Sequence, residues 1–535
     1  MEMLIEKILP VALLLILFIN GCFSSKKAVT VEPTEYQTGE QIESPAKVFL
    51  KDSSLVIFNE GFTVSGNFIE GPGTQYWLNY SGDSSQHRIH LDSIATMTTY
   101  EEKQTGGTIL GSAIMGITGT IMAPLSVYCL SCPKCCFGSC PTVYTTDGNK
   151  YELEAELFSY NLSRFFQEVD FDRLTQKPQT DGRFTIRLTN EALETHYINQ
   201  FKLQAVHHPS NTTAYPTPEG RVALVKDHIL PVEVINSDGQ DIQAMVRKQD
   251  TTWFTGVSSR FDQAENSLSR DWIDLKLQVP ETANKVTLVL NVRNTLLSTV
   301  LFYDVVLASQ GVKALEWTRR LNSDSLYAAF YHAAYSAFSG MDVKIKQKGT
   351  NSEAVWKTVS SFGDVGPLAW KQQAIELPVY HDENGTMSVR LEWFPDNFMI
   401  DFIGYDIGYN EMGKVETVYP DSVANYSADL NPYVLEHLES TDSDYLVAYP
   451  GDANYFYYHI PQKQEFATTL FLQSSGYYTE WLRGNWISHK ATDYTFNLFQ
   501  PEETLEQLKR SWRRDQELLE RTFFETKIPL KESKR

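Results

Sequence analysis

Alternation of apolar and polar residues is the feature that most constrains how this chain of 535 residues folds. The pattern is clearest over residues 184–189, 201–206, 286–292 and 387–393. Because successive side chains of a strand point to opposite faces, a period of two predicts strands with one buried face. Asp-Gly or Asn-Gly pairs, typical of hairpin turns, occur at residues 147–148, 181–182 and 384–385. The chain is therefore predicted to be mainly β, with antiparallel, sandwich-like sheets.

The composition supports a folded β-rich protein and disfavours one class of partner. Aromatic residues make up 13% of the chain and favour strands, and the length allows two to four domains. The formal net charge of -21 argues against nucleic acid as a partner, because phosphate backbones are bound by clustered Lys and Arg.

Two segments have the signature of helices. The first runs from Ser323, a candidate N-cap, to Gly340 at the C-terminal cap. The second starts at Pro501 and carries an apolar stripe typical of a docked helix. The stripe consists of Leu505, Leu508, Trp512, Leu519 and Phe523.

The N-terminus has the pattern of an export signal. Residues 8–19 are apolar and lead into Gly21-Cys22, but the run is shorter than the ~20 residues of a membrane-spanning helix and contains Pro10. The segment resembles a bacterial lipobox, which implies cleavage after Gly21 and acylation of Cys22. A plain cleaved signal and an uncleaved anchor are the alternatives.

The lipobox resemblance predicts where the protein acts. It implies a palmitate-bearing lipoprotein of the cell outer membrane that contacts the membrane through its N-terminal lipid. Serines and two lysines follow Cys22, rather than the acidic tract of a surface-export signal. We therefore expect the protein to face the periplasm.

The chain is predicted to have eight successive parts. They are a signal peptide (1–21), a tether (22–45), a small β module (46–103), a Gly-rich apolar segment with a Cys cluster (104–141), a β-sandwich-like domain (142–312), a helical insertion (313–340), a second β-sandwich-like region (341–500) and a C-terminal helix (501–524).

The Gly-rich segment has more than one interpretation. Residues 108–130 contain no charged residue and are as long as a spanning helix, but Pro124 interrupts them. A helical hairpin packed on the body or the membrane surface, a membrane-spanning helix and a loop are the alternatives.

A cysteine cluster follows this segment, at Cys129, Cys132, Cys135, Cys136 and Cys140. In an exported protein such thiols usually form disulfides, and five cysteines leave one unpaired. A tetrahedral zinc site is an alternative, and its candidate ligands are Cys129, Cys132, Cys135 and Cys140. An iron–sulfur cluster, lipid modification and burial in a membrane are further alternatives.

Residues 139–144 contain a Ser-Cys-Pro triplet, and an Asp-Gly pair follows within residues 147–151. Together with residues 154–156, 187–191, 195–197, 206–209 and 476–481, these segments resemble an uncharacterised family of exported bacterial lipoproteins. In that family a Gly-rich apolar segment precedes the Ser-Cys-Pro triplet and a hairpin with an Asp-Gly turn. The matches are spread over most of the chain from residue 104 onward. The family has no known function, so the resemblance implies an exported β-rich architecture and no chemistry.

The sequence contains no recognisable catalytic motif: nucleophile elbow, zinc-protease helix, phosphate loop and dinucleotide fingerprint are all missing. No catalytic residue and no cofactor is therefore predicted. Weaker candidates are a calcium site at residues 147–149, a metal site at His207-His208, a sugar site formed by Glu392, Asp396 and Asp401 near Trp393 and Phe394, and an aromatic run at residues 455–459. Each candidate has a simpler structural explanation. Residues 147–149 suit a hairpin turn, and His207-His208 suit the end of a strand. The carboxylates suit surface charges around core aromatics, and the aromatic run suits a half-buried strand.

The function predicted from these features is that of a lipid-anchored cell-envelope protein. We expect it to bind or scaffold an envelope protein or glycan, and not to be an enzyme. The alternative is a carbohydrate-binding or carbohydrate-active lipoprotein.

Acylation of Cys22 is directly testable. Cells fed labelled palmitate are expected to label the wild-type protein and not the Cys22→Ala variant, which is also expected to leave the membrane fraction on a carbonate wash. A variant that loses the label and resists the wash would indicate that residues 108–130 are embedded in a membrane.

Overall fold

The computed structural model divides into two compact units, Met1–Val127 and Tyr128–Arg535. It describes residues 24–31, 38–42, 46–50, 54–58, 61–76, 82–104, 140–146, 150–250, 252–266, 268–310, 314–348, 354–382, 385–409, 413–425, 430, 434–435, 438–442, 444–460, 466–481, 483, 501–523 and 530. The predicted signal peptide, Cys22, residues 108–130 and Cys129, Cys132, Cys135 and Cys136 lie outside these residues.

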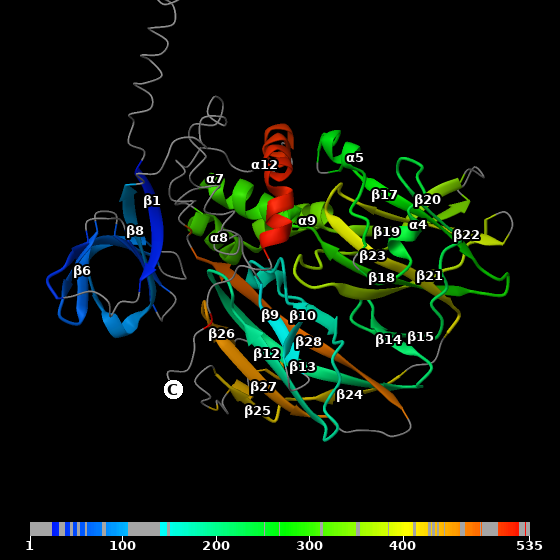
Figure 1. Ribbon diagram of the computed structural model, residues 1–535, viewed down its shortest axis with the longest axis horizontal. Coiled ribbons are helices and arrows are strands. Elements are labelled where there is room, and N and C mark those ends of the chain that lie inside the picture. Colours follow the sequence, from blue (N-terminus) through cyan, green and yellow to red (C-terminus); the bar gives the residue numbers. More distant parts are fainter. Residues whose placement is uncertain are drawn as a thin grey trace, which may run out of the picture. The chain divides into compact units, whose positions relative to one another are not determined.

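The first unit is one antiparallel sheet in the order β1-β8-β3-β4-β6-β5-β2, with β7 beside β6 (Figure 1). Its elements are β1 (Ser24–Val31), β2 (Gln41–Ile42), β3 (Ala46–Leu50), β4 (Leu55–Phe58), β5 (Phe62–Ser65), β6 (Phe68–Tyr76), β7 (Gly82–His90), the 3-10 turn η2 (Leu91–Ser93) and β8 (Ile94–Gln104). Its core includes Val48, Val56, Phe58, Ile69 and Met97, which have no exposed surface.

This sheet contradicts the prediction that residues 22–45 are a tether. Residues 22–45 contain β1, which pairs with β8 from Ser24 opposite Gln104 to Val31 opposite Met97. They also contain β2, which pairs with β5. The segment is polar, but an edge strand can form through backbone hydrogen bonds with one face covered. The polar composition of the segment therefore did not predict its strands.

The second unit contains two β-sandwiches. The first, lobe one, packs the sheet β10-β9-β12-β27-β25 against the sheet β11-β28-β13-β24, in which β26 also pairs with β13. Its strands are β9 (Thr142–Thr146), β10 (Tyr151–Glu156), β11 (Val169–Arg173), β12 (Arg183–Thr189), β13 (Glu194–His208), β24 (Lys414–Val418), β25 (Ser422–Ala424), β26 (Leu446–Ala448), β27 (Ala453–His459) and β28 (Ala467–Glu480).

The other sandwich, lobe two, packs the sheet β16-β17-β22-β19-β20 against the three-stranded sheet β21-β18-β23. Its elements are β16 (Glu233–Asn236), α4 (Gln243–Val246), α5 (Ser258–Asp262), β17 (Asp271–Gln278), β18 (Lys285–Asn294), β19 (Met341–Lys348), β20 (Ala354–Phe362), β21 (Lys371–Pro378), β22 (Thr386–Trp393) and β23 (Phe398–Ile407). Alternate residues of β17 are buried, as the period of two in the sequence requires.

A small hairpin joins the two lobes. It consists of β14 (Thr213–Pro216) and β15 (Val222–Val225). Its Tyr215 packs with Val289 and Phe402 of lobe two. Ala214, on the opposite face of the strand, belongs to a cluster with Phe171 of lobe one. The hairpin is therefore a wedge with one apolar face on each lobe.

The two β regions are not successive, as residues 142–312 and 341–500 were predicted to be. Lobe one combines strands from the beginning of the unit with strands from its end, and lobe two is inserted between them. Alternation within a strand fixes which face is buried but carries no information on the partner strand, so the sequence could not reveal this insertion.

Helices lie against the two sandwiches; in the view of Figure 1 they lie above lobe one. They are η3 (Arg164–Phe166), α6 (Leu297–Val300), the π-helix η4 (Leu301–Leu307), α7 (Ala308–Gln310), α8 (Ala314–Ser323), α9 (Ser325–Ser339) and α12 (Pro501–Thr522). The helical insertion is longer than predicted. The N-cap of α9 is Asp324, not Ser323, because its carboxylate accepts the Tyr327 amide at 3.0 Å.

The C-terminal helix was predicted correctly. All five residues of its stripe are buried, and Trp512 is fully enclosed.

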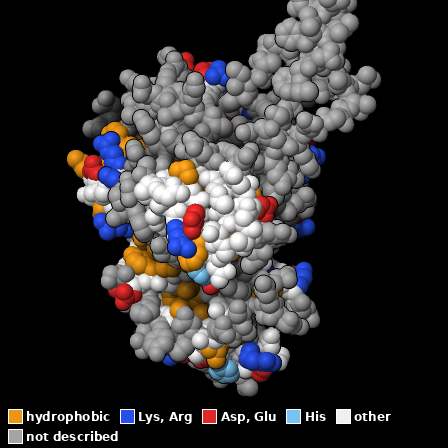
Figure 2. All heavy atoms as spheres, turned by 90° about the vertical axis from the view of Figure 1, so that its left-hand side faces the viewer, with side chains coloured by type: hydrophobic (Ala, Val, Ile, Leu, Met, Phe, Trp, Pro, Cys, Tyr) orange, Lys and Arg blue, Asp and Glu red, His pale blue; other side chains and the backbone are white. Residues whose placement is uncertain are grey.

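Within the described parts of the chain, no helix is both long enough and apolar enough to cross a membrane. On the face drawn in Figure 2, basic and acidic side chains are interspersed over the described residues, and apolar side chains gather in separate patches.

Trp512 is expected to hold α12 on the second unit. Its ring is fully buried and its indole Nε1 donates to Asp396 Oδ2 at 3.2 Å. Trp512→Ala should lower the free energy of unfolding by about 3–5 kcal/mol, measured by urea unfolding. The exposed Arg510→Ala on the same helix is the control, with an effect within about 0.5 kcal/mol. Equal effects would contradict the role of the stripe.

Candidate functional site

A cleft of about 250 Å³ opens between the lobes of the second unit. Lobe one contributes the end of β10, the turn after it and β11; lobe two contributes the end of β20 and the start of β21; the turn of the wedge hairpin closes one side. The lining residues are Glu156, Phe158, Ser159, Tyr160, Asn161, Glu168, Val169, Asp170, Phe171, Thr217, Pro218, Gly220, Ser361, Phe362, Gly363, Asp364, Val365, Lys371 and Gln373.

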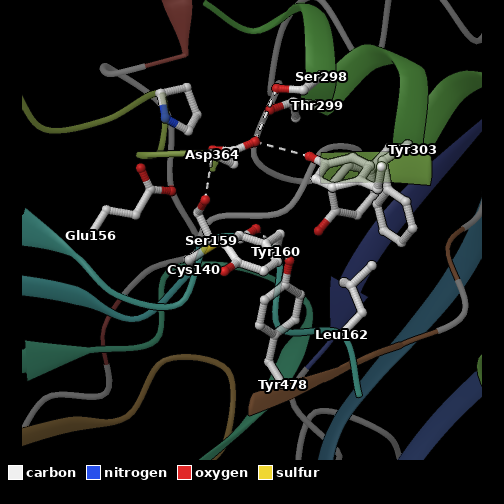
Figure 3. Close-up of a pocket in the computed structure, with 13 residues that line it drawn as sticks. Cys140, Glu156, Ser159, Tyr160, Leu162, Ser298, Thr299, Tyr303, Asp364 and Tyr478 are labelled. Atoms are coloured by element: carbon white, nitrogen blue, oxygen red, sulfur yellow. Dashed lines mark hydrogen bonds between the residues drawn. The ribbon is translucent and has the colours of Figure 1, made fainter. Parts of the chain in front are cut away.

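Asp364 is the point at which three parts of the second unit meet. Its Oδ1 accepts the Ser159 hydroxyl of lobe one at 2.7 Å. Its Oδ2 accepts the hydroxyls of Tyr335 on α9 at 2.9 Å and Ser298 on α6 at 3.3 Å. Figure 3 shows the carboxylate between Ser159 and the helix that carries Ser298. With all these donors around it, Asp364 joins the lobes and is not available as a reacting group.

Glu156 sits against the backbone of lobe two. Its Oε2 accepts the Leu368 amide at 2.8 Å. A Cβ placed on Gly366 would lie 2.5 Å from the same oxygen, and Gly366 has a φ of +86°. Only glycine satisfies both constraints, so the close approach of carboxylate and backbone explains the residue at this position.

An ion cluster crosses the cleft from β11 to β21. Lys371 Nζ lies 2.5 Å from Asp170 Oδ1 and 3.0 Å from Asp172 Oδ1. The two carboxylates alternate along β11 and therefore share one of its faces. Burial, together with the charge of Asp170, raises the pKa of Asp172 to about 7, although Lys371 opposes the shift.

Two buried acceptors in the lining have no hydrogen-bond partner within the described residues. They are Asn161 Oδ1 and Gln373 Oε1, whose side chains are 3% and 5% exposed. The other end of the Asn161 amide donates to Gly476 O at 3.0 Å, which fixes the direction of its oxygen. A buried acceptor without a donor costs about 1–3 kcal/mol, so a ligand donor that reached either oxygen would be stabilising.

A smaller cavity of about 20 Å³, the size of one water molecule, lies beside the cleft and shares Glu156, Ser159 and Asp364 with it (Figure 3). Cys140 lines it, and its thiol donates to Ser159 O at 3.4 Å. Burial raises the pKa of the Cys140 thiol well above its usual value, and the charges of Glu156 and Glu194 add to the shift. Because the thiolate is the reactive form, Cys140 is a poor nucleophile.

Behind this cavity a buried polar network connects η4 to the ends of β13 and β28. Tyr303 OH donates to Glu194 Oε1 at 3.1 Å and also contacts Glu480. Arg483 donates to Glu480 at 2.6 Å, and His196 contacts Glu194 at 3.2 Å. Burial raises the pKa of Glu480 to about 8 against the attraction of Arg483. The network is enclosed, and therefore it holds the fold together without forming a ligand site.

The weaker carboxylate candidates do not converge. Glu392 pairs with Lys344, Asp396 with Arg513, and Asp401 accepts from Asn291. Trp393 and Phe394 are fully buried and cannot stack on a sugar.

The histidine candidates are strand residues with hydroxyl partners. His207 Nδ1 lies 2.9 Å from Thr468 Oγ1, and His208 Nε2 lies 2.9 Å from Thr469 Oγ1. Among the residues that the structure describes, no group of three or more His, Cys, Asp and Glu could hold a metal ion. Cys140 is buried and free, whereas its possible disulfide or zinc partners and residues 147–149 fall outside the described ranges.

The aromatic run at residues 455–459 forms β27 with one face buried. Tyr455 and Tyr457 point away from the core, and Tyr457 is 40% exposed. Tyr151 lies 6.4 Å from Tyr455 between ring centroids. Arg187 covers both Tyr151 and Tyr144, at 4.0 and 4.6 Å from their centroids. We call these four tyrosines and Arg187 the tyrosine face of lobe one.

Sequence reasoning did not find the cleft, because its lining comes from distant segments. Asp170 and Lys371 are about 200 positions apart in the chain. One signal was present in the sequence: Asp170 and Asp172 alternate around Phe171, which predicts two carboxylates on one face of a strand.

Comparisons with known proteins leave the family open. No family model and no curated protein matches the sequence. A solved tandem domain, CBM22-1-CBM22-2 of Xyn10C from Paenibacillus barcinonensis, is similar at 8% identity, with 55% of this chain and 94% of that chain covered and a TM-score of 0.18. A GH31 alpha-xylosidase from Xanthomonas citri is also 8% identical, with 84% and 35% covered and a TM-score of 0.14. Scores this low carry no argument about function.

Asp172 makes the stability of the protein depend on pH. Its raised pKa means that, between about pH 4 and pH 7, the folded chain binds a proton that the unfolded chain releases, so stability falls as pH rises. Asp172→Asn removes this loss. Relative to wild type, the variant should gain on the order of 2 kcal/mol between about pH 5 and pH 7, measured by urea unfolding.

The same substitution at Asp238, which is exposed, is the matched control and should leave the profile unchanged. A difference between Asp172→Asn and wild type that does not vary with pH would show that the carboxyl is ionised in the folded state throughout this range.

Proposed function

We propose that this chain is a lipid-anchored, non-enzymatic binding protein of the cell envelope whose ligand occupies the cleft between the lobes. The observation that carries the proposal is a cleft of about 250 Å³ whose lining includes Asn161 and Gln373, each with a buried side-chain oxygen that has no hydrogen-bond partner within the described residues. The volume suits a small molecule or one residue of a larger one. The envelope location is inferred from the lipobox resemblance at Cys22.

Binding is favoured over hydrolysis by the state of the carboxylates. Glycoside hydrolysis needs one carboxyl that donates a proton and a second that attacks or activates water. In the cleft, Asp364 is surrounded by donors, Glu156 accepts a backbone amide, and Asp170 is paired with Lys371. The fourth carboxylate of the lining, Glu168, accepts the Tyr160 hydroxyl at 3.1 Å. These groups organise the lobes, so the lining offers recognition without an acid–base pair.

The lining also defines the chemistry of the ligand. Acceptors dominate, and the ammonium of Lys371 is already held by two carboxylates. A ligand that donates hydrogen bonds, through hydroxyl or ammonium groups, complements such a surface. Half-buried Tyr160 adds an aromatic ring to the lining.

Gln373→Leu tests the cleft. The substitution removes the acceptor and keeps the size of the side chain, so the fold should be as stable or more stable. Probes are a neutral disaccharide, a linear diamine and a dicarboxylate, measured by calorimetry with the full chain. We expect binding of a donor-rich probe that weakens about tenfold in the variant, and no binding of the dicarboxylate.

Gln347→Leu is the matched control, because this half-buried glutamine of β19 lies outside the lining of the cleft. Its binding should equal that of wild type. Failure of every probe to bind, or turnover of a glycoside that depends on Gln373, would refute the proposal.

Carbohydrate binding is the second candidate, favoured by the tyrosine face of lobe one. Aromatic rings with polar tips suit a partly wet contact. Disaccharide binding that survives Gln373→Leu and is lost in Tyr457→Ala would locate the sugar on that face. Tyr380→Ala, at a tyrosine of lobe two that is 43% exposed, is the control for this outcome.

A further inference from the structure

Helix α9 is apolar on both its buried and its exposed side. Its buried residues include Tyr331, Tyr335 and Phe338. Its exposed residues between positions 326 and 337 are Leu326, Ala329, Phe330, Ala333 and Ala337. A helix that is apolar all round is normally enclosed, so the outer side of α9 is a surface to be explained.

The exposed residues form one stripe along the helix. Their spacing of three or four positions places them on a single face. Leu326 is 80% exposed and Phe330 is 58% exposed, which is high for large apolar side chains. Neighbouring η3 adds Phe165, which is 43% exposed, next to Phe166, whose ring stacks on Tyr331 of α9. We call this surface the α9 stripe.

Arginines border the α9 stripe at both ends. At its N-terminal end, the guanidinium of Arg320 lies 3.8 Å from the Tyr327 ring centroid, and Arg164 lies 5.0 Å from that of Phe165. At the other end, Arg270 donates to Ala337 O at 2.9 Å.

The N-terminal end of the stripe is basic. Arg319, next to Arg320, is also exposed there, and Asp324 lies 3.8 Å from Arg320. At the other end, the charges of Asp342 and Glu392 act on Arg270. In a chain with a net charge of -21, the three arginines at the N-terminal end are a local concentration of positive charge.

We propose that the α9 stripe docks on an anionic phospholipid surface, with α9 lying in the plane of the interface. Helices of this kind bury an apolar face at the boundary between headgroups and acyl chains, while flanking basic residues pair with anionic headgroups. Leu326 and Phe330 would enter the apolar boundary, and the arginines would remain at headgroup level. The inference stands on the surface of α9 and does not need the cleft to bind a ligand.

A second copy of the chain fits this surface less well than lipid. In a two-fold dimer built on the stripe, the same patch would be buried on both subunits. If the two helices ran parallel, the arginines at the N-terminal end of the stripe would face their own copies, and like charges across an interface are repulsive.

Photo-crosslinking tests the docking. The full chain is bound to phosphatidylcholine vesicles that contain a photoactivatable phosphatidylglycerol, and crosslinked peptides are identified by mass spectrometry. We expect crosslinks in residues 325–339. The double variant Leu326→Asp and Phe330→Asp should reduce them at least about tenfold, since charged side chains then replace the two large apolar side chains that enter the interface.

The matched control is the double variant Val232→Asp with Val415→Asp, which replaces two exposed apolar residues outside α9. These valines are 54% and 52% exposed. It should leave the crosslinks unchanged, and circular dichroism should show both variants folded. A third variant, Arg319→Glu with Arg320→Glu, should lower the preference for anionic over neutral vesicles.

Crosslinks confined to other segments, or equal crosslinks in the α9 variant and wild type, would overturn the proposal. So would an oligomer, detected by light scattering, that dissociates in the α9 variant while the lipid crosslinks persist. That last result would assign the stripe to a second copy.

Discussion

The pairing of β13 with β28 is the constraint on which the second unit depends. The ladder runs from Glu194 opposite Glu480 to His208 opposite Ala467 and joins segments from the two ends of the unit. On its other edge, β13 also pairs with β24 and β26. Lobe one therefore exists only as a product of long-range contacts, and the position of the cleft follows from it, because β11 pairs with β28.

The same ladder creates an electrostatic problem at its end. Glu194 and Glu480 face each other directly, a pairing that is destabilising for like charges. Arg483 and Tyr303 contact both carboxylates, and burial favours a proton on Glu480. Removing Arg483 would leave buried charge uncompensated. The network thus makes η4 a necessary partner of the sheet, which links the helical layer to lobe one.

The sequence predicted what depends on local pattern. The β class and the stripe of α12 were correct, because alternation and helical spacing report on burial within one element. The strand at residues 24–31 was missed, because it pairs with β8 through backbone hydrogen bonds, which do not depend on apolar residues. The insertion of lobe two and the cleft were also missed. Asp364 binds Ser159 across 205 positions, and no spacing rule connects residues that the topology brings together.

The inserted position of lobe two has a consequence for the order in which the chain is made. Lobe two ends with β23 at Ile407, so all its strands have been synthesised while lobe one still lacks β24 to β28. Until Glu480 has emerged, β13 presents an unpaired hydrogen-bonding edge, a template for aggregation. While lobe two folds, the early strands of lobe one, β9 to β13, must stay unfolded or be shielded. A holding chaperone, or passage through an export channel in the unfolded state, would meet this requirement.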